Sequence, residues 1–160
     1  MDNSYFPMFV DISHWKILVA GGGVIATRRV KTLLKFQAQI TVVAPKVTEE
    51  LQLLAKEKQI KLLQKQYEEQ DLDQADLVLA ATDQKAVNQQ ILKDCRRRNE
   101  KENRKILVNT ADDKAACDFY FPAVVKEDEI VIGINSGGKD PKKTHRVRGK
   151  IEKILKEETI

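Results

Sequence analysis

A short apolar run that ends in three glycines and continues into a helical pattern is the most constraining feature of this chain. The run covers residues 17–20, and Gly21, Gly23 and Ala26 follow it in the order G-x-G-x-x-A. In a dinucleotide-binding turn the first glycine permits the tight bend, the second admits a pyrophosphate, and the small third residue allows close helix–sheet packing. The N-terminus of the next helix adds backbone donors and the positive end of its dipole. This segment predicts a nucleotide-binding turn, and the alternative is a purely structural glycine turn.

Apolar runs alternate with helix-like periodicity through the first two thirds of the chain. Short, continuously apolar strands that alternate with helices are typical of a parallel sheet covered on both faces. Right-handed crossovers then make a Rossmann-like, doubly wound α/β fold. The pattern predicts strands at 17–20, 40–44, 60–63, 77–81 and 106–109, and helices at 24–36, 47–58 and 87–98.

The pattern of apolar runs and helical periodicity changes after Asn109. Residues 119–125 and 129–135 predict the two strands of a hairpin, and a basic helix is expected from Pro141 to residue 158. A hairpin this small cannot bury both of its faces alone, which favours association with a partner. We therefore expect a Rossmann domain over 1–112 and a dimerisation and substrate-binding region, a small hairpin plus a helix, over 113–160.

Composition narrows the class of protein. The chain has 160 residues, of which 32% are charged, and its formal net charge is +4, which favours anionic partners. It has no apolar stretch near the roughly 20 residues that cross a bilayer and no secretory leader, so we expect a cytoplasmic protein without membrane contact. Two cysteines and two histidines, Cys95, Cys117, His14 and His145, predict neither a disulfide framework nor a metal site, and Cys95 is expected to be a packed thiol.

Polar residues follow the fourth and fifth predicted strands, at the sheet edge where ligands bind in this fold class. Thr82 and Asp83 either line a cofactor cleft or cap the next helix, and the two interpretations are equally supported. Asp112 and Asp113 are candidates for a general base or a helix cap, and the residues alone favour capping.

The second predicted strand lacks the acidic residue that often binds a ribose 2′-hydroxyl. It ends at Ala44 and Pro45, and Lys46 could meet a 2′-phosphate or simply be solvated. The choice between NAD and NADP therefore stays open at this point.

A glycine turn, Ser136-Gly137-Gly138, precedes a run of cations. A charge run is usually a solvated helix face, but after a glycine turn it could also bind one multiply anionic ligand. Nucleic acid is the competing partner, although the run has no interleaved aromatic residues for base stacking. The cations are Lys139, Lys142, Lys143, His145, Arg146, Arg148 and Lys150.

Taken together, the motifs "GGGVIATRR", "LVLAATDQKAVNQQI", "VNTADDKAACDFYFPAVV" and "INSGG" resemble those of the precorrin-2 dehydrogenase family, the dehydrogenase component of siroheme synthase. The resemblance extends over nearly the whole chain. It implies NAD-dependent oxidation of precorrin-2 to sirohydrochlorin by a homodimer. It also implies that Asp112 is the general base, which replaces the capping interpretation, and that no nucleic acid is bound.

The resemblance also bears on metal insertion. Some family members continue into a helical region and insert iron, whereas this chain stops at residue 160, so we expect no ferrochelatase activity and no metal site. The alternative function is a regulatory NAD-sensing module without catalysis.

The residues above give two sets of site candidates. The expected cofactor-binding residues are Gly21, Gly23, Val24, Ala44, Pro45, Thr82 and Asp83, and the expected substrate-binding residues are Asn109, Ser136, Gly137, Lys139 and Arg146.

Overall fold

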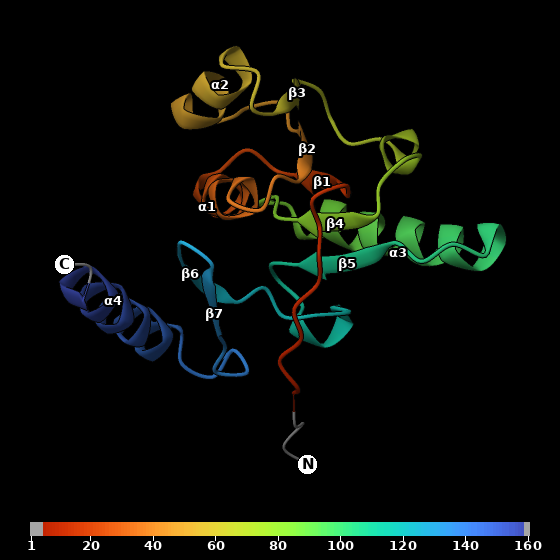
Figure 1. Cartoon of the computed structure of the whole chain (residues 1–160). Coiled ribbons are helices and arrows are strands. Elements are labelled where there is room, and N and C mark those ends of the chain that lie inside the picture. The colour runs from red at the N-terminus through yellow and green to blue at the C-terminus, as the bar shows by residue number, and fades with distance from the viewer. Residues whose placement is uncertain (1–4, 159–160) are drawn as a thin grey trace. The chain divides into compact units, whose positions relative to one another are not determined.

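The computed structural model describes residues 5–158 (Figure 1). Contacts divide the chain into two compact units: residues 11–119, and a second unit in which the N-terminal segment up to Val10 joins the chain from Tyr120 onward. The first unit continues seven residues past the expected end at 112. It does so because Asp118 bonds back to β5, where its backbone N–H donates to the carbonyl of Val108 and its carboxylate accepts from the N–H of Val108.

The first unit is built on a five-stranded parallel sheet, which confirms the predicted Rossmann-like α/β fold. The strands lie side by side in the order β3-β2-β1-β4-β5 (Figure 1), so the chain order reverses between β1 and β4. Ligands bind at such a switch point, beyond the carboxyl ends of the strands. The strands are β1 (Lys16–Ala20), β2 (Gln39–Val43), β3 (Lys61–Leu63), β4 (Leu77–Ala80) and β5 (Leu107–Thr110).

Three helices of the first unit connect the strands, and two of them begin or end at a residue suited to that position. The Thr48 side chain caps α2 by accepting the N–H of Leu51, and Asn103 ends α3 in the left-handed conformation that asparagine tolerates. α1 packs on β1 and β2, α2 on β3, and α3 on β4 and β5. The helices are α1 (Val24–Leu34), α2 (Glu49–Lys56) and α3 (Lys85–Glu102), and two short 3-10 turns that the sequence did not predict are η1 (Glu69–Leu72) and η2 (Lys114–Ala116).

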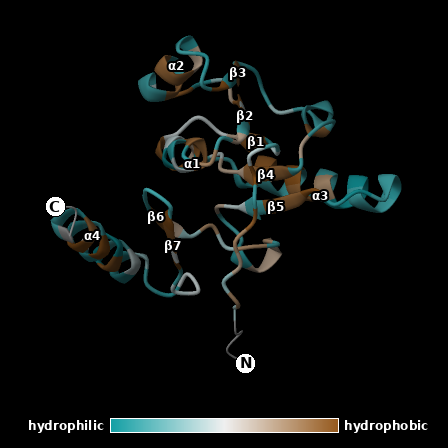
Figure 2. Ribbon diagram, in the orientation of Figure 1, coloured by the Kyte–Doolittle hydropathy of each residue, from teal (hydrophilic) through white to brown (hydrophobic). Residues whose placement is uncertain are grey.

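The central strands form the core of this unit. All four residues of β4 are buried, and β4 is coloured hydrophobic in Figure 2, whereas the C-terminal half of α3 is hydrophilic. Ile91 and Cys95 of α3 pack against Val78 and Val108 in one buried cluster. Burial of this kind confirms that Cys95 is a packed thiol.

We expect Cys95 to resist alkylation in the folded protein. Burial raises the pKa of its thiol to about 12, and the side chain is 0% exposed. The protonated thiol is therefore favoured by folding, so its contribution to stability is present below pH 9 and is lost as the pH rises toward 12. Mass spectrometry after iodoacetamide treatment at pH 8 should show the partly exposed Cys117 modified before Cys95; the reverse order would contradict this packing.

The second unit contains an antiparallel hairpin, β6 (Ala123–Glu127) and β7 (Ile130–Ile134), and the helix α4 (Pro141–Glu158). The predicted first strand, 119–125, was placed too early. Glu127 pairs with Ile130, and Asp128 makes the tight turn with a φ of 46°. No helix in the described range 5–158 is long and apolar enough to cross a membrane.

Candidate functional site

The glycine turn joins β1 to α1 at the switch point of the sheet. Gly21 has a φ of +123°, and a Cβ built on it would lie 2.3 Å from the carbonyl oxygen of Ala81, which follows β4. Its N–H donates to the carbonyl of Val43 at the end of β2. Only glycine fits a backbone that bends this way against a neighbouring strand end. The structure thus confirms that Gly21 permits the tight bend between strand and helix, and its contact with a cofactor stays a prediction.

Gly22 is also required, although the G-x-G-x-x-A pattern treats this position as variable. A Cβ on Gly22 would lie 2.1 Å from the carbonyl oxygen of Lys46, and its own carbonyl accepts the N–H of Thr48. The hydroxyl groups of Thr27 and Thr48 lie 2.8 Å apart and bond the start of α1 to the start of α2. The loop after β2 is therefore packed directly on the glycine turn.

Gly23 borders open space. No heavy atom would lie within 4 Å of a Cβ built there. Gly23 is the N-cap of α1 without a side-chain cap, and the first turn of that helix has no acidic residue. Backbone donors at an uncapped, acid-free helix N-terminus fit the pyrophosphate of a dinucleotide. Val24 is 68% exposed beside this turn, and Ala26 is buried against the sheet as expected.

A hydrogen-bonded network connects the carboxyl ends of β4 and β5. The buried side chain of Asn88, in the first turn of α3, accepts from the Thr82 N–H at 3.1 Å and from the Thr82 hydroxyl at 2.7 Å. Its Nδ2 donates to the Thr82 carbonyl and to Oδ1 of Asp112, both at 3.1 Å. The Thr110 hydroxyl donates to the same Asp112 oxygen. Asp112 is exposed, so its carboxylate is fixed on one side and open to solvent on the other.

The two carboxylates after β5 have different roles. Asp113 caps η2, because its Oδ1 accepts the N–H of Ala115 at 3.1 Å. Asp112 caps no helix. At the end of β4, the N-cap of α3 is Gln84, whose own side chain makes no capping bond, and Asp83 is exposed. Capping by Thr82 or Asp83 was therefore a wrong alternative for α3, although the Thr82 hydroxyl accepts the Gln84 N–H.

The contacts of the other predicted residues of this unit say less about ligand binding. Ala44 is buried, and its N–H bonds to the carbonyl of Leu63, whereas Pro45 and Lys46 are exposed after it. Asn109 is 4% exposed, and its Nδ2 donates to the carbonyl of Phe119 at 2.8 Å. Asn109 thus holds the chain that leaves η2, and its role toward a substrate stays a prediction.

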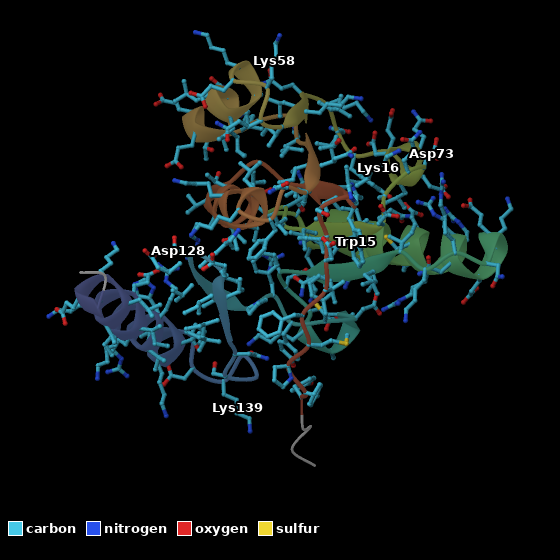
Figure 3. The ribbon with its side chains drawn as sticks, in the orientation of Figure 1. Trp15, Lys16, Lys58, Asp73, Asp128 and Lys139 are labelled. Carbon is cyan, nitrogen blue, oxygen red and sulfur yellow. The ribbon has the colours of Figure 1, made fainter. Side chains whose placement is uncertain are left out.

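The other residues predicted for substrate binding, those besides Asn109, belong to the second unit. The Ser136 hydroxyl accepts the N–H of Asp140 at 3.3 Å, and Gly137 has a φ of +62°. Asp140 in turn accepts the N–H of Lys143 and so begins α4. Lys139 and Arg146 are exposed, and Figure 3 shows Lys139 extending from the turn. The structure therefore gathers Gly21, Thr82 and Asp112 within one unit and leaves Ser136 in the other.

Asn88 is the site residue that the sequence analysis missed. It was included only as part of a motif, with no role of its own. The available signal is its position six residues after Thr82, inside the first turn of a helix that starts at the functional edge of the sheet. In the structure Asn88 is buried, whereas Lys85 and Gln89 on the same turn are exposed. Position 88 therefore lies on the side of α3 that faces the strand ends.

Comparison with known proteins identifies relatives over most of the chain. Residues 8–123 match the family described as "Putative NAD(P)-binding". The chain is 36% identical over 152 residues to "Siroheme synthase" of Mannheimia succiniciproducens, covering 95% of this chain and 31% of that protein. It is 38% identical over 151 residues to "Siroheme synthase" of Pseudoalteromonas translucida, covering 94% of this chain and 31% of the relative. The chain spans about a third of the length of these curated relatives.

A solved structure extends the comparison to the fold. The chain superimposes on "SirC, precorrin-2 dehydrogenase" with a TM-score of 0.74 and 29% sequence identity. The match covers 94% of this chain and 71% of that one. The likeness therefore includes the hairpin and α4 as well as the parallel sheet.

Proposed function

The chain belongs to the putative NAD(P)-binding family and is homologous to siroheme synthases and to a precorrin-2 dehydrogenase, and from this premise we propose that it oxidises precorrin-2 to sirohydrochlorin with NAD. One observation supports catalysis above all. The Asp112 carboxylate lies exposed after β5 and is hydrogen-bonded through Asn88 to Thr82, which follows β4. The residue before Thr82, Ala81, lies directly against Gly21 of the glycine turn. A base held beside a nucleotide turn is the arrangement that a dehydrogenase needs.

The glycine turn is the proposed cofactor site. The open side of Gly23 and the uncapped N-terminus of α1 would hold the pyrophosphate, and Gly21 and Gly22 keep the backbone in place. Val24, Pro45 and Asp83 are exposed around this edge and are proposed to contact the rest of the dinucleotide. When bound, the nicotinamide supplies the hydride acceptor. No acidic side chain lies in the loop 44–48 directly after β2, and Lys46 is exposed there, so the preference for NAD rests on the family resemblance rather than on these residues.

Asp112 is the proposed general base. The overall reaction removes two electrons and two protons from precorrin-2: one hydride leaves for NAD, and one proton leaves for a base. In this proposal the second proton passes to the Asp112 carboxylate and then to solvent, so that NADH and one proton are released per sirohydrochlorin. A positioned carboxylate of this kind contributes on the order of 10²–10⁴ in rate.

The second unit is proposed to bind the multiply carboxylated tetrapyrrole. Ser136 and Gly137 form a half-buried turn, the exposed cation Lys139 follows it, and the exposed Arg146 lies on the next helix. Arginine and lysine are suited to carboxylate groups. Asn109 is included as a proposed substrate contact near the end of β5.

The proposed activity is tested by anaerobic incubation of the protein with precorrin-2 and either NAD or NADP, in parallel. Initial rates are followed by the absorbance of sirohydrochlorin. We expect product with NAD and a slower rate with NADP. Absence of product with both nucleotides, from protein that binds them, would favour the NAD-sensing alternative instead.

We also propose that the protein is a homodimer. In the second unit, exposed apolar side chains recur on the N-terminal segment and on α4: Phe6 is 87% exposed, Phe9 72% and Ile154 53%. Apolar surface of this kind is typical of interaction sites. Sedimentation velocity should show a dimer for the unmodified protein and a shift toward monomer for Ile154→Glu. A monomer at all concentrations would contradict the proposal, and Lys153→Glu serves as a control on the same helix.

A further inference from the structure

The network at the strand ends determines which way the Asn88 amide points. The Thr82 N–H can only donate, so the Asn88 atom 3.1 Å from it must be the oxygen. The Thr82 hydroxyl is 2.7 Å from the same oxygen. The other amide atom is then the nitrogen, which donates to the Thr82 carbonyl and to Asp112 Oδ1. Both donors and both acceptor positions of Asn88 are used, and the side chain is only 1% exposed.

This orientation has a consequence for the carboxylate of Asp112. Its Oδ1 accepts two hydrogen bonds, one from Asn88 and one from the Thr110 hydroxyl. Within residues 5–158, Oδ2 receives no hydrogen bond from the protein. An exposed aspartate would otherwise sample several rotamers, because little packing holds it. With Oδ1 held on both sides, Oδ2 is the oxygen that is presented to solvent or to a ligand.

We infer that Asn88 is a positioning residue that holds Asp112 by Oδ1 so that Oδ2 takes the proton from the substrate. This inference rests on the proposed function of Asp112 as a base. Asn88 also fixes Thr82 at the end of β4, so one buried side chain determines the spacing between the cofactor edge and the base. Correct placement of a catalytic group strongly affects the rate, and a misplacement of about 1 Å can cost about 10²-fold.

A matched control lies on the same helix. Asn99 is also an asparagine of α3, and its side-chain amide both donates and accepts a hydrogen bond. Its Nδ2 donates to the carbonyl of Ile106, and its Oδ1 accepts the Ile106 N–H. It lies eleven residues further along α3, roughly 16 Å from Asn88 along the helix axis. Asn99 thus has a comparable structural role and no connection to Asp112.

The test compares Asn88→Asp with Asn99→Asp in the full chain. Asn88→Asp keeps the shape of the side chain but replaces the donor to Asp112 by an oxygen. We expect kcat to fall at least tenfold, with KM for precorrin-2 and for NAD within threefold of the unmodified values. Asn99→Asp should lower the melting temperature but keep kcat within twofold. A kcat for Asn88→Asp within twofold of the unmodified protein would overturn the inference.

The two proposals can fail separately. If Asp112→Asn loses activity and Asn88→Asp does not, the base remains and the positioning role is wrong. If the unmodified protein makes no sirohydrochlorin, the proposed function is wrong, and the orientation of Asn88 is then judged by NMR. The Asn88 side-chain amide protons should shift on Asp112→Ala and not on Asp113→Ala. This NMR result does not require the Asn88 variant to fold, and unchanged amide protons in Asp112→Ala would overturn the inference.

Discussion

Replacing Asp112 by asparagine is expected to lower kcat by about 10²–10⁴-fold while leaving the protein folded. The expected loss follows from removing the proposed proton acceptor. The fold should tolerate the change because Asp112 is exposed, caps no helix, and would still offer an oxygen to Asn88 and Thr110. Steady-state kinetics measures the loss, and thermal unfolding of the same samples measures stability.

The matched control for this prediction is the neighbouring aspartate. Asp113→Asn alters the carboxylate that caps η2, so it should cost up to about 1 kcal/mol of stability and change kcat by less than twofold. Retention of more than a tenth of the activity in Asp112→Asn would exclude Asp112 as the base. A large loss of kcat in Asp113→Asn instead would move the base to that position.

Gly21→Ala is expected to destabilise the first unit by about 3–5 kcal/mol. The new Cβ would lie 2.3 Å from the carbonyl oxygen of Ala81, and the φ of +123° is unfavourable for any residue with a side chain. The clash is with backbone at the end of a buried strand, so neither partner can move without disturbing the sheet. Chemical denaturation followed by circular dichroism measures the difference in the free energy of unfolding.

Gly23 provides the contrasting substitution in the same turn. Its φ is −85°, and nothing lies within 4 Å of the position that a Cβ would take, so Gly23→Ala should change stability by less than about 1 kcal/mol. The added methyl group would instead occupy the space proposed for the pyrophosphate, and the affinity for NAD should fall at least tenfold. Equal effects of the two substitutions on stability, or unchanged NAD binding in Gly23→Ala, would contradict the account of this turn.

Features that depend on local chain geometry were predicted well from the sequence. The glycine turn is one, because its backbone conformation is set by Gly21 itself and by the strand and helix on either side. The alternation of apolar runs predicted all five strands of the sheet to within one residue at each end, because a short, continuously apolar run between helical segments is typical of a buried parallel strand. α4 was predicted with its observed start because Pro141 suits the first turn of a helix, and the structure adds a cap from Asp140.

Features that depend on contacts between distant residues were not predictable in the same way. The start of β6 was misplaced because the apolar residues Phe119 and Tyr120 bind other parts of the chain: the carbonyl of Phe119 accepts from Asn109, and Tyr120 packs on Tyr5. The distinct roles of Asp112 and Asp113 required the backbone of η2, which has no strong sequence signal. The role of Asn88 required the ends of β4 and β5 to be in place.

The proposed transfer of a hydride from precorrin-2 to NAD is tested most directly by its stoichiometry. Protein, precorrin-2 and NAD are combined without oxygen, and NADH and sirohydrochlorin are measured in the same sample. The account predicts one NADH for each sirohydrochlorin, with neither formed by Asp112→Asn above about 1% of the unmodified rate, as expected for loss of a general base. Protein that binds both precorrin-2 and NAD but forms neither product would contradict it.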